Sequence, residues 1–341
     1  MRRALFALLS CAFVLALSAC GSSDESVSSL LRQTFTSGGS VDSGKVTAQL
    51  EGDVRGIQGL TGPFKLRLEG PFESAGKGKL PRFDFNLGIT VSGQSFSAGG
   101  VSTSDRGWLR VNGQAYAVPD AMFKKFRDSY LAGARKSGNK QQPAPSLAAL
   151  GVDPRTWLRG ARKAGEADIA GTKTIHITGG LNVARLLDDV NNLLNRANTT
   201  ADAKQLPPKL TDAQRRDLQR AVRSASVDVY TGKDDKLLRR LDVRVSLQRS
   251  GEVQGGNLRF QLQLDALNQH QDIKAPAGAK PLDELVSSLR SGVLPGMTGS
   301  AGGSTRGGAT APRQTTDYLQ CLQAAGEDVA KLQRCAALQG R

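Results

Sequence analysis

Histidine, cysteine and aromatic residues are scarce in this chain of 341 residues. It contains two His and four Cys, and 5% of its residues are aromatic. Zinc clusters and haem centres take their ligands largely from His and Cys, so both are disfavoured. The motifs GxSxG, HExxH and CxxC are absent, and no apolar run after the first twenty residues is long enough to cross a bilayer. We therefore expect neither a polytopic membrane protein nor an enzyme, and neither a metal nor a cofactor.

The few candidate catalytic groups have simpler interpretations. His176 lies between Ile175 and Ile177, so alternation places it on a polar strand face, and His270 follows the last strong strand pattern. Neighbouring carboxylates on a strand or helix point in different directions, so the adjacent pairs are weak evidence for paired acid–base chemistry. These pairs are Asp188–Asp189 and Asp234–Asp235. An envelope enzyme nevertheless remains one of the hypotheses.

The overall composition predicts a globular chain with a substantial core. Hydrophobic residues make up 39% of the sequence and charged residues 23%. The 39 glycines argue against a mostly helical protein. Lys and Arg number 46 against 31 Asp and Glu, which gives a formal net charge of +15. A basic protein favours anionic partners.

The first twenty residues resemble a bacterial lipoprotein signal. Met1-Arg2-Arg3 is a short basic segment, residues 4–17 are apolar, and Leu17-Ser18-Ala19-Cys20 has the pattern of a lipobox. The resemblance implies a signal peptide over 1–19, cleavage before Cys20, a diacylglycerol on its thiol, and a fatty acyl chain such as palmitate on the new N-terminus. Residues 20–25 would tether the body to the extracytoplasmic side of the cell membrane, facing the periplasm or cell envelope. The alternative is an ordinary secretory signal with an incidental cysteine.

Two cysteines then remain in an oxidising compartment. Cys11 would leave with the signal and Cys20 would carry lipid, so Cys321 and Cys335 can form a disulfide. Gly326 interrupts the apolar helical pattern between them, which favours a small helical hairpin over 315–341. The alternative is two independent thiols on one longer helix. Residues 291–314 are rich in Gly, Ser, Thr, Ala and Pro and are expected to be a linker.

The body, residues 26–290, is dominated by strict alternation of apolar and polar residues. This period of two predicts at least five amphipathic strands with one dry face. Their one-sidedness favours an antiparallel sheet and disfavours a doubly wound parallel one. With weaker strands at 95–103, 108–118 and 172–178, the total of eight to ten is enough for a strongly curved sheet. The strong strands have apolar positions at Val46, Ala48, Leu50; Phe64, Leu66, Leu68; Phe83, Phe85, Leu87, Ile89, Val91; Leu241, Val243, Val245, Leu247; and Leu258, Phe260, Leu262, Leu264.

Amphipathic helices are expected to cover the dry face of this sheet. A period of 3.6 predicts helices over 26–34, 119–136, 181–194 and 211–225, and from Pro281 onward. Thr211 and Gln214 form a capping box at the start of the fourth helix. In the helix over 119–136, Met122, Phe123 and Phe126 share the stripe that is expected to face inward, with Tyr130 and Leu131.

Together these features resemble the LolA-like lipoproteins of the LppX and LprG type. The resemblance is carried by the lipobox, the first helix, the strands interrupted by a helical block, and two stretches, Ser226–Val245 and Asp168–Gly179. It implies an α+β fold, in which a curved antiparallel half-barrel has helices over its concave apolar face and carries lipid or glycolipid acyl chains. The linker and cysteine hairpin have no counterpart in the family.

The resemblance implies that apolar strand residues line a lipid cavity. The alternative is that they fill an ordinary core without a cavity. The candidates are Val46, Leu50, Phe64, Leu66, Leu68, Phe83, Phe85, Leu87, Ile89, Val227, Val229, Leu241, Val243, Val245, Leu258, Phe260 and Leu262. An acyl chain in water needs a dry slot, because each exposed methylene costs about 0.8 kcal/mol.

Basic residues on two helices are candidates for contact with lipid head groups or an anionic membrane surface. They are Lys124, Lys125, Arg127, Arg215 and Arg216. The alternative is a solvated face of amphipathic helices. Nucleic acid is not expected as a partner outside the cytoplasm. The second functional hypothesis is a protein-binding module of the same fold, such as a lipoprotein chaperone or envelope sensor, which would contact another envelope protein through the C-terminal hairpin.

Overall fold

The computed structural model describes residues 25–37, 40–56, 62–76, 78–136, 152–200 and 210–290. All of them lie within the first of the two units into which the chain divides, Met1–Met297. Cys20, Cys321 and Cys335, the linker over 291–314 and the hairpin over 315–341 lie outside the described residues. Among the residues that are described, no helix is long and apolar enough to cross a membrane.

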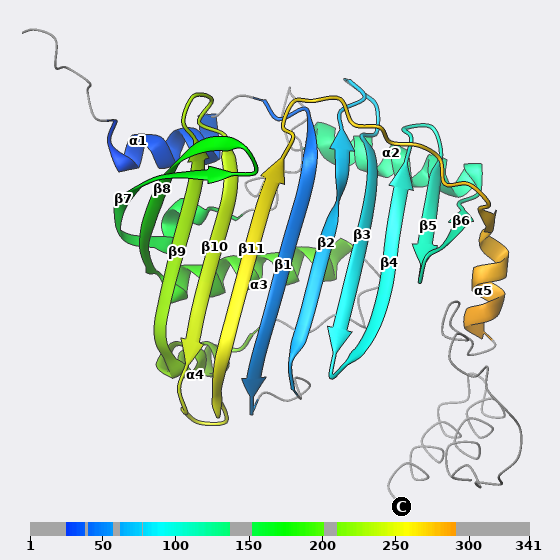
Figure 1. Cartoon of the computed structure of the whole chain (residues 1–341). Helices are drawn as coiled ribbons and strands as arrows, with labels where there is room; N and C mark the ends of the chain where they lie inside the picture. Colours follow the sequence, from blue (N-terminus) through cyan, green and yellow to red (C-terminus); the bar gives the residue numbers. More distant parts are fainter. Residues whose placement is uncertain are drawn as a thin grey trace, which may run out of the picture. The chain divides into compact units, whose positions relative to one another are not determined.

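One large open sheet organises the described residues (Figure 1). Its strand order is β12-β6-β5-β4-β3-β2-β1-β11-β10-β9-β8-β7, and β12 beside β6 is the parallel pair. The strands are β1 (Ser43–Arg55), β2 (Phe64–Glu73), β3 (Arg82–Val91), β4 (Gln94–Ser102), β5 (Gly107–Val111), β6 (Gln114–Ala117), β7 (Leu158–Ile169), β8 (Thr172–Leu181), β9 (Val222–Gly232), β10 (Leu238–Leu247), β11 (Gly255–Asp265) and β12 (Lys280–Pro281). The predicted α+β class with a curved, mostly antiparallel sheet is confirmed.

Strand register brings the apolar residues of neighbouring strands onto one face. Leu50 of β1 lies opposite Leu66 of β2 on one side and Phe260 of β11 on the other. The same row continues to Ile89 of β3 and to Val243 of β10. Since side chains alternate between faces with a period of two, the whole apolar set of these strands shares one surface.

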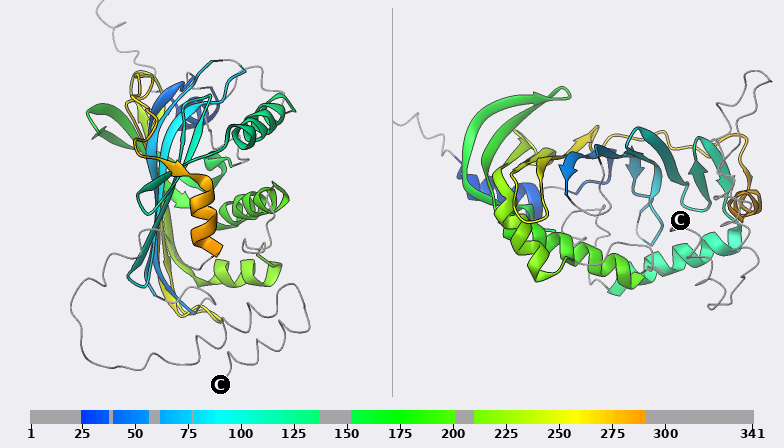
Figure 2. Two further views of the ribbon diagram at one scale, coloured as in Figure 1. Left: turned by 90° about the vertical axis from the view of Figure 1, so that its right-hand side faces the viewer. Right: turned by 90° about the horizontal axis from the view of Figure 1, so that it is seen from below.

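Helices cover this apolar face from one side (Figure 2). The first helix, α1, continues into a π-helical turn, Gln33–Ser37, and a 3₁₀ turn, Pro154–Trp157, precedes β7. Side chains of α1, this 3₁₀ turn and the start of α3 pack on β8–β10 to form the main core. The helices are α1 (Val27–Arg32), α2 (Asp120–Lys136), α3 (Val183–Thr200), α4 (Asp212–Ala221) and α5 (Leu282–Arg290).

The capping box of α4 is confirmed, but the predicted end of the helix is wrong. The Thr211 side chain accepts a hydrogen bond from the backbone N–H of Gln214, and the Gln214 side chain bonds back to the backbone of Thr211. The helix ends at Ala221 instead of Ala225, because the following residues already pair with β10. Backbone pairing with a neighbouring strand therefore overrides the helical pattern of the sequence at this boundary.

The long strand β7 is not predicted by alternation. Its sequence is mostly charged and small residues, and its pairing with β8 shifts register between Arg159 and Arg162 and again between Lys163 and Gly165. Each shift inserts an irregularity, so the period of two is lost. As an edge strand, β7 also leaves most of its side chains exposed, and no apolar face marks it in the sequence.

Candidate functional site

Two halves of the apolar sheet face differ sharply in burial. On β8–β10, Ile177, Val227, Val229 and Leu241 are fully buried, and Val243 is 4% exposed. On β3, by contrast, every apolar side chain from Phe83 to Ile89 is only half-buried. The first half is a packed core, whereas the second half keeps part of its apolar surface accessible.

We call the second half the accessible strip. It runs over β11, β1, β2 and β3, and Leu68 at its centre is 36% exposed. Small residues on β4 border the strip, since Gly100 lies opposite Phe85 and Ala98 opposite Leu87. Its half-buried or exposed members are Leu50, Leu66, Leu68, Phe83, Phe85, Leu87, Ile89 and Phe260.

The apolar side of α3 is also incompletely buried. Figure 1 shows α3 running across the strands, and Figure 2 places α2, α3 and α4 on one side of the sheet. Val183 and Leu186, near its start, pack against the main core. Further along, Leu187 and Val190 are half-buried. Sheet and helix therefore both keep apolar surface accessible beyond the core, which is unlike a close-packed interior.

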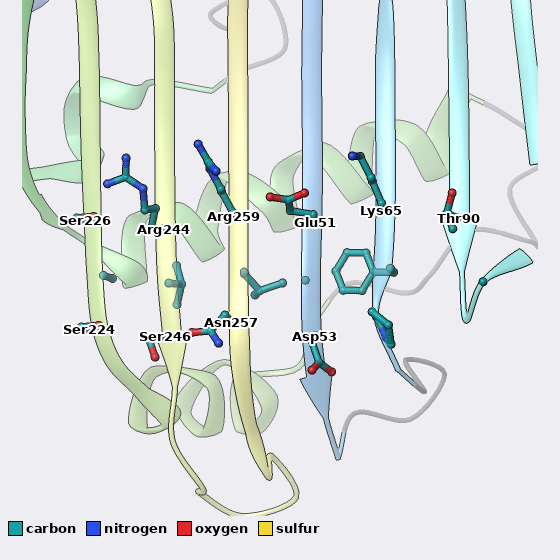
Figure 3. Close-up of a pocket in the computed structure, with 17 residues that line it drawn as sticks. Glu51, Asp53, Lys65, Thr90, Ser224, Ser226, Arg244, Ser246, Asn257 and Arg259 are labelled. Atoms are coloured by element: carbon teal, nitrogen blue, oxygen red, sulfur yellow. The ribbon is translucent and has the colours of Figure 1, made fainter. Parts of the chain in front are cut away.

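A cleft of about 880 Å³ crosses β9, β10, β11, β1 and β2 on the polar face of the sheet (Figure 3). Its polar lining includes Glu51, Lys65, Arg244 and Arg259, and the row of residues between its polar side chains is Ala225, Val245, Leu258, Gly52 and Phe64. Gly52 lies between Leu258 and Phe64: a Cβ there would lie 2.6 Å from Leu258 Cδ2 and 2.9 Å from Phe64 Cε1. Glycine at this position lets the two apolar side chains of neighbouring strands approach each other.

The predicted cavity residues are thus brought onto one face, but they do not share one environment. Six are buried: Phe64, Val227, Val229, Leu241, Val243 and Leu262. Of these, Phe64 borders the cleft and the other five belong to the main core. Val46 and Phe260 pack against that core while half-buried. The accessible surface is concentrated on β1–β3 and β11.

The basic candidates do not form one cluster. Lys124 lies 3.0 Å from Asp128 and Arg127 lies 3.6 Å from the same carboxylate, all on α2. On α4, Arg215 is half-buried and binds Asp188 of α3, so it joins two helices. Arg216 and Lys125 are exposed.

A dense charge network lies on the opposite, polar face of the sheet. The His176 ring stacks on Tyr230 with centroids 4.4 Å apart, and its Nε2 lies 2.9 Å from Asp228 Oδ1. Asp242, 1% exposed, lies 2.8 Å from Arg240 Nε and 3.6 Å from Arg259. The predicted polar position of His176 is confirmed. Alternation alone did not reveal that cross-strand register places Asp228 directly opposite Asp242.

Opposing effects set the pKa of Asp228. Burial acts to raise it, but hydrogen bonds from His176 and Thr178 and the nearby charge of Arg244 lower it more, so the pKa lies below its ordinary value. Arg244 Nη1 lies 2.9 Å from Asp228 Oδ2. The ionised carboxylate is thus the form that the folded protein favours.

The adjacent carboxylates Asp188 and Asp189 have different partners, as predicted. Asp188 binds Arg215, whereas Asp189 accepts hydrogen bonds from Trp157 Nε1 and from the backbone of Asp153. These contacts hold helix α3 against its neighbours. Within the described ranges, no group of three or more His, Cys, Asp or Glu residues is arranged to hold a metal ion.

Comparisons with known proteins find similarity among solved structures. No family model matches the chain, and a search of curated proteins finds no significant match. LprF from Mycobacterium bovis is 13% identical, with 73% of this chain and 96% of that chain covered and a TM-score of 0.37. The lipoprotein LppX from Mycobacterium tuberculosis is 15% identical, with 73% and 100% covered and a TM-score of 0.34. The MucA/MucB complex of Pseudomonas aeruginosa gives 11% identity, coverage of 69% and 56%, and a TM-score of 0.21.

The resemblance expected from the sequence, to lipoproteins of the LppX type, is therefore found among the solved structures as well. At these identities and TM-scores, the similarity says nothing about the site or its ligand.

Proposed function

We propose that this protein is a membrane-anchored extracytoplasmic lipoprotein that binds and carries lipid or glycolipid acyl chains. The proposal rests on one observation: the accessible strip and the apolar side of α3 lie on the same side of the sheet, and neither is fully buried. A protein that only needed a core would gain stability by closing these surfaces on each other. An acyl chain between them would remove both from water.

The dimensions suit a long, unbranched ligand. The ten residues of β3 extend over roughly 33 Å at ~3.3 Å per residue. Each methylene moved from water onto the accessible strip contributes about 0.8 kcal/mol, so ten would contribute about 8 kcal/mol before the costs of association.

The lining chemistry also suits this role. Aliphatic and phenylalanine side chains dominate the strip, and two of its members, Phe83 and Phe85, have stacked rings with centroids 5.1 Å apart. Such a surface binds by excluding water, without a reacting group. Lipidation of Cys20, which the lipobox pattern predicts, would hold the carrier near its source of lipid.

Native mass spectrometry of the full chain, expressed with export in a bacterium and purified gently, tests this proposal. We expect a bound species that solvent extraction identifies as a diacyl lipid or glycolipid. Leu68→Glu should reduce the bound fraction strongly, because it places a charge in the centre of the strip. Val286→Glu on α5 is the matched control, since Val286 is 38% exposed and Leu68 is 36% exposed.

Two results would contradict the proposal. One is a protein that is purified empty and also takes up no added diacyl lipid. The other is equal lipid binding by wild type, Leu68→Glu and Val286→Glu, because bound lipid would then lie away from the strip.

A further inference from the structure

Helix α2 has 17 residues, yet it is held to the sheet by little buried surface. Over residues 120–133, where burial is described, Phe123 is the buried side chain, at 5% exposed. Its ring packs on Gly107 of β5, where a Cβ would lie 2.5 Å from Phe123 Cδ2. The sequence predicts that Met122, Phe126 and Tyr130 also face inward, but the sheet does not cover them, and all three are exposed.

Those three side chains form an exposed apolar stripe. Met122 is 55% exposed, Phe126 52% and Tyr130 37%. They are spaced at i, i+4 and i+8, so they follow one another along the same side of the helix. Large apolar side chains grouped in this way on a soluble domain usually mark a surface that contacts something else.

A lysine flanks the stripe. Lys125 is three residues after Met122 and is therefore its neighbour on the helix surface, and it is exposed. Lys124 lies on the other side of the helix, two residues from both Met122 and Phe126, and shares Asp128 with Arg127. An apolar stripe with a flanking lysine is the arrangement of helices that lie in the plane of a membrane interface, where long side chains reach up to the phosphates.

The charge of the whole chain points to the same partner. The formal net charge of +15 attracts an anionic bilayer. A peptide partner would more naturally enter an apolar groove, whereas this stripe lies along one side of a single helix. The bilayer surface is therefore the occupant that the charge and the shape of α2 fit.

We propose that α2 docks on anionic lipid bilayers, with Met122, Phe126 and Tyr130 below the head groups and with Lys125 at the phosphates. This inference deepens the proposed function by naming the element that meets the membrane. It rests on the exposure of α2 and not on the accessible strip, so docking and lipid carriage can fail separately.

Depth-dependent fluorescence quenching tests the proposal. The full chain, with its own anchor, is incorporated into vesicles of brominated phosphatidylcholine with added phosphatidylglycerol. Phe126→Trp reports on α2, and Leu289→Trp on α5 is the matched control, because these residues are 52% and 51% exposed. The native Trp108 and Trp157 are buried and form a common background. Leu68→Trp reports on acyl chains bound in the strip.

We expect bromolipid to quench Phe126→Trp several-fold more than Leu289→Trp. The difference should shrink in neutral vesicles, and also when Lys125→Gln is added. Lys274→Gln, which removes an exposed lysine elsewhere, should leave it unchanged. Quenching of Phe126→Trp without quenching of Leu68→Trp would support docking while contradicting carriage.

Three outcomes would overturn docking. The first is equal quenching, or no quenching, of Phe126→Trp and Leu289→Trp. The second is quenching of Phe126→Trp that is indifferent to lipid charge. The third is quenching that persists after the protein is separated from vesicles, since it would then come from bound cargo.

Discussion

Replacing the buried Asp242 with Asn should destabilise the protein by about 2 kcal/mol. The carboxylate is 1% exposed and is flanked by Arg240 at 2.8 Å and Arg259 at 3.6 Å. Asn keeps the shape of the side chain and removes its charge, so the two guanidinium groups lose their shared counter-charge. Breaking a fully buried ion pair typically costs about 3–5 kcal/mol.

Two features of the network place the expected cost below that range. The side chains of Arg240 and Arg259 are 25% and 43% exposed, so both can regain contact with water. Asp228 lies directly opposite Asp242 in the strand register, and removing one of two neighbouring negative charges relieves repulsion. Contact of the arginines with water limits the free energy that is lost, and the relief of repulsion between the carboxylates offsets part of it. We therefore expect a net destabilisation of about 2 kcal/mol.

Urea unfolding followed by tryptophan fluorescence measures this difference. Trp108 and Trp157 are both buried in the folded protein and become exposed on unfolding. Asp272→Asn is the control: its side chain is 69% exposed and pairs with Lys274 in solvent, so its loss should leave the urea midpoint nearly unchanged. If Asp242→Asn proves as stable as wild type or more stable, repulsion between the two carboxylates dominates and the reasoning is refuted.

Three further predictions concern other parts of the molecule. Because the pKa of Asp228 lies below its ordinary value, its ionised form stabilises the fold above about pH 4, and this contribution is lost at lower pH. Asp228→Asn should therefore flatten the fall of the urea midpoint between about pH 5 and pH 3, and an unchanged slope would contradict this. Gly52→Val should cost about 1–3 kcal/mol, because its side chain overlaps Leu258, whereas a urea midpoint equal to wild type would show that the neighbours move aside freely. Cys20→Ala should shift the exported protein from the detergent to the aqueous phase on phase separation, and retention in the detergent phase would count against lipid anchoring.

Much of the sheet could be predicted because its information is local. In β1, β2, β3, β10 and β11, apolar and polar residues alternate strictly, and one dry face follows from the geometry of an extended chain. Strand β7 could not be found in this way, because its two register shifts and its edge position remove the alternating signal. The end of α4 was misplaced for a related reason: pairing with β10, a distant segment, decides where the helix stops.

For the candidate site, the sequence identifies the apolar residues but does not say which of them are buried. Leu87 and Val229 have similar chemistry and similar alternating neighbours, yet one is half-buried and the other is fully buried. The difference arises because α1 and the start of α3 pack on β8–β10 and not on β3. Likewise, the sequence of α2 marks an apolar stripe, but it does not say that Phe123 is buried while Met122 and Phe126 stay exposed.

The sequence by itself therefore determined the class of fold, the dry face of the sheet and the amphipathic helices, since each depends on the spacing of neighbouring residues. Only the tertiary structure decided which apolar surfaces are covered and which remain accessible, and that Asp228 faces Asp242. These properties depend on contacts between segments far apart in the chain, which local periodicity does not encode.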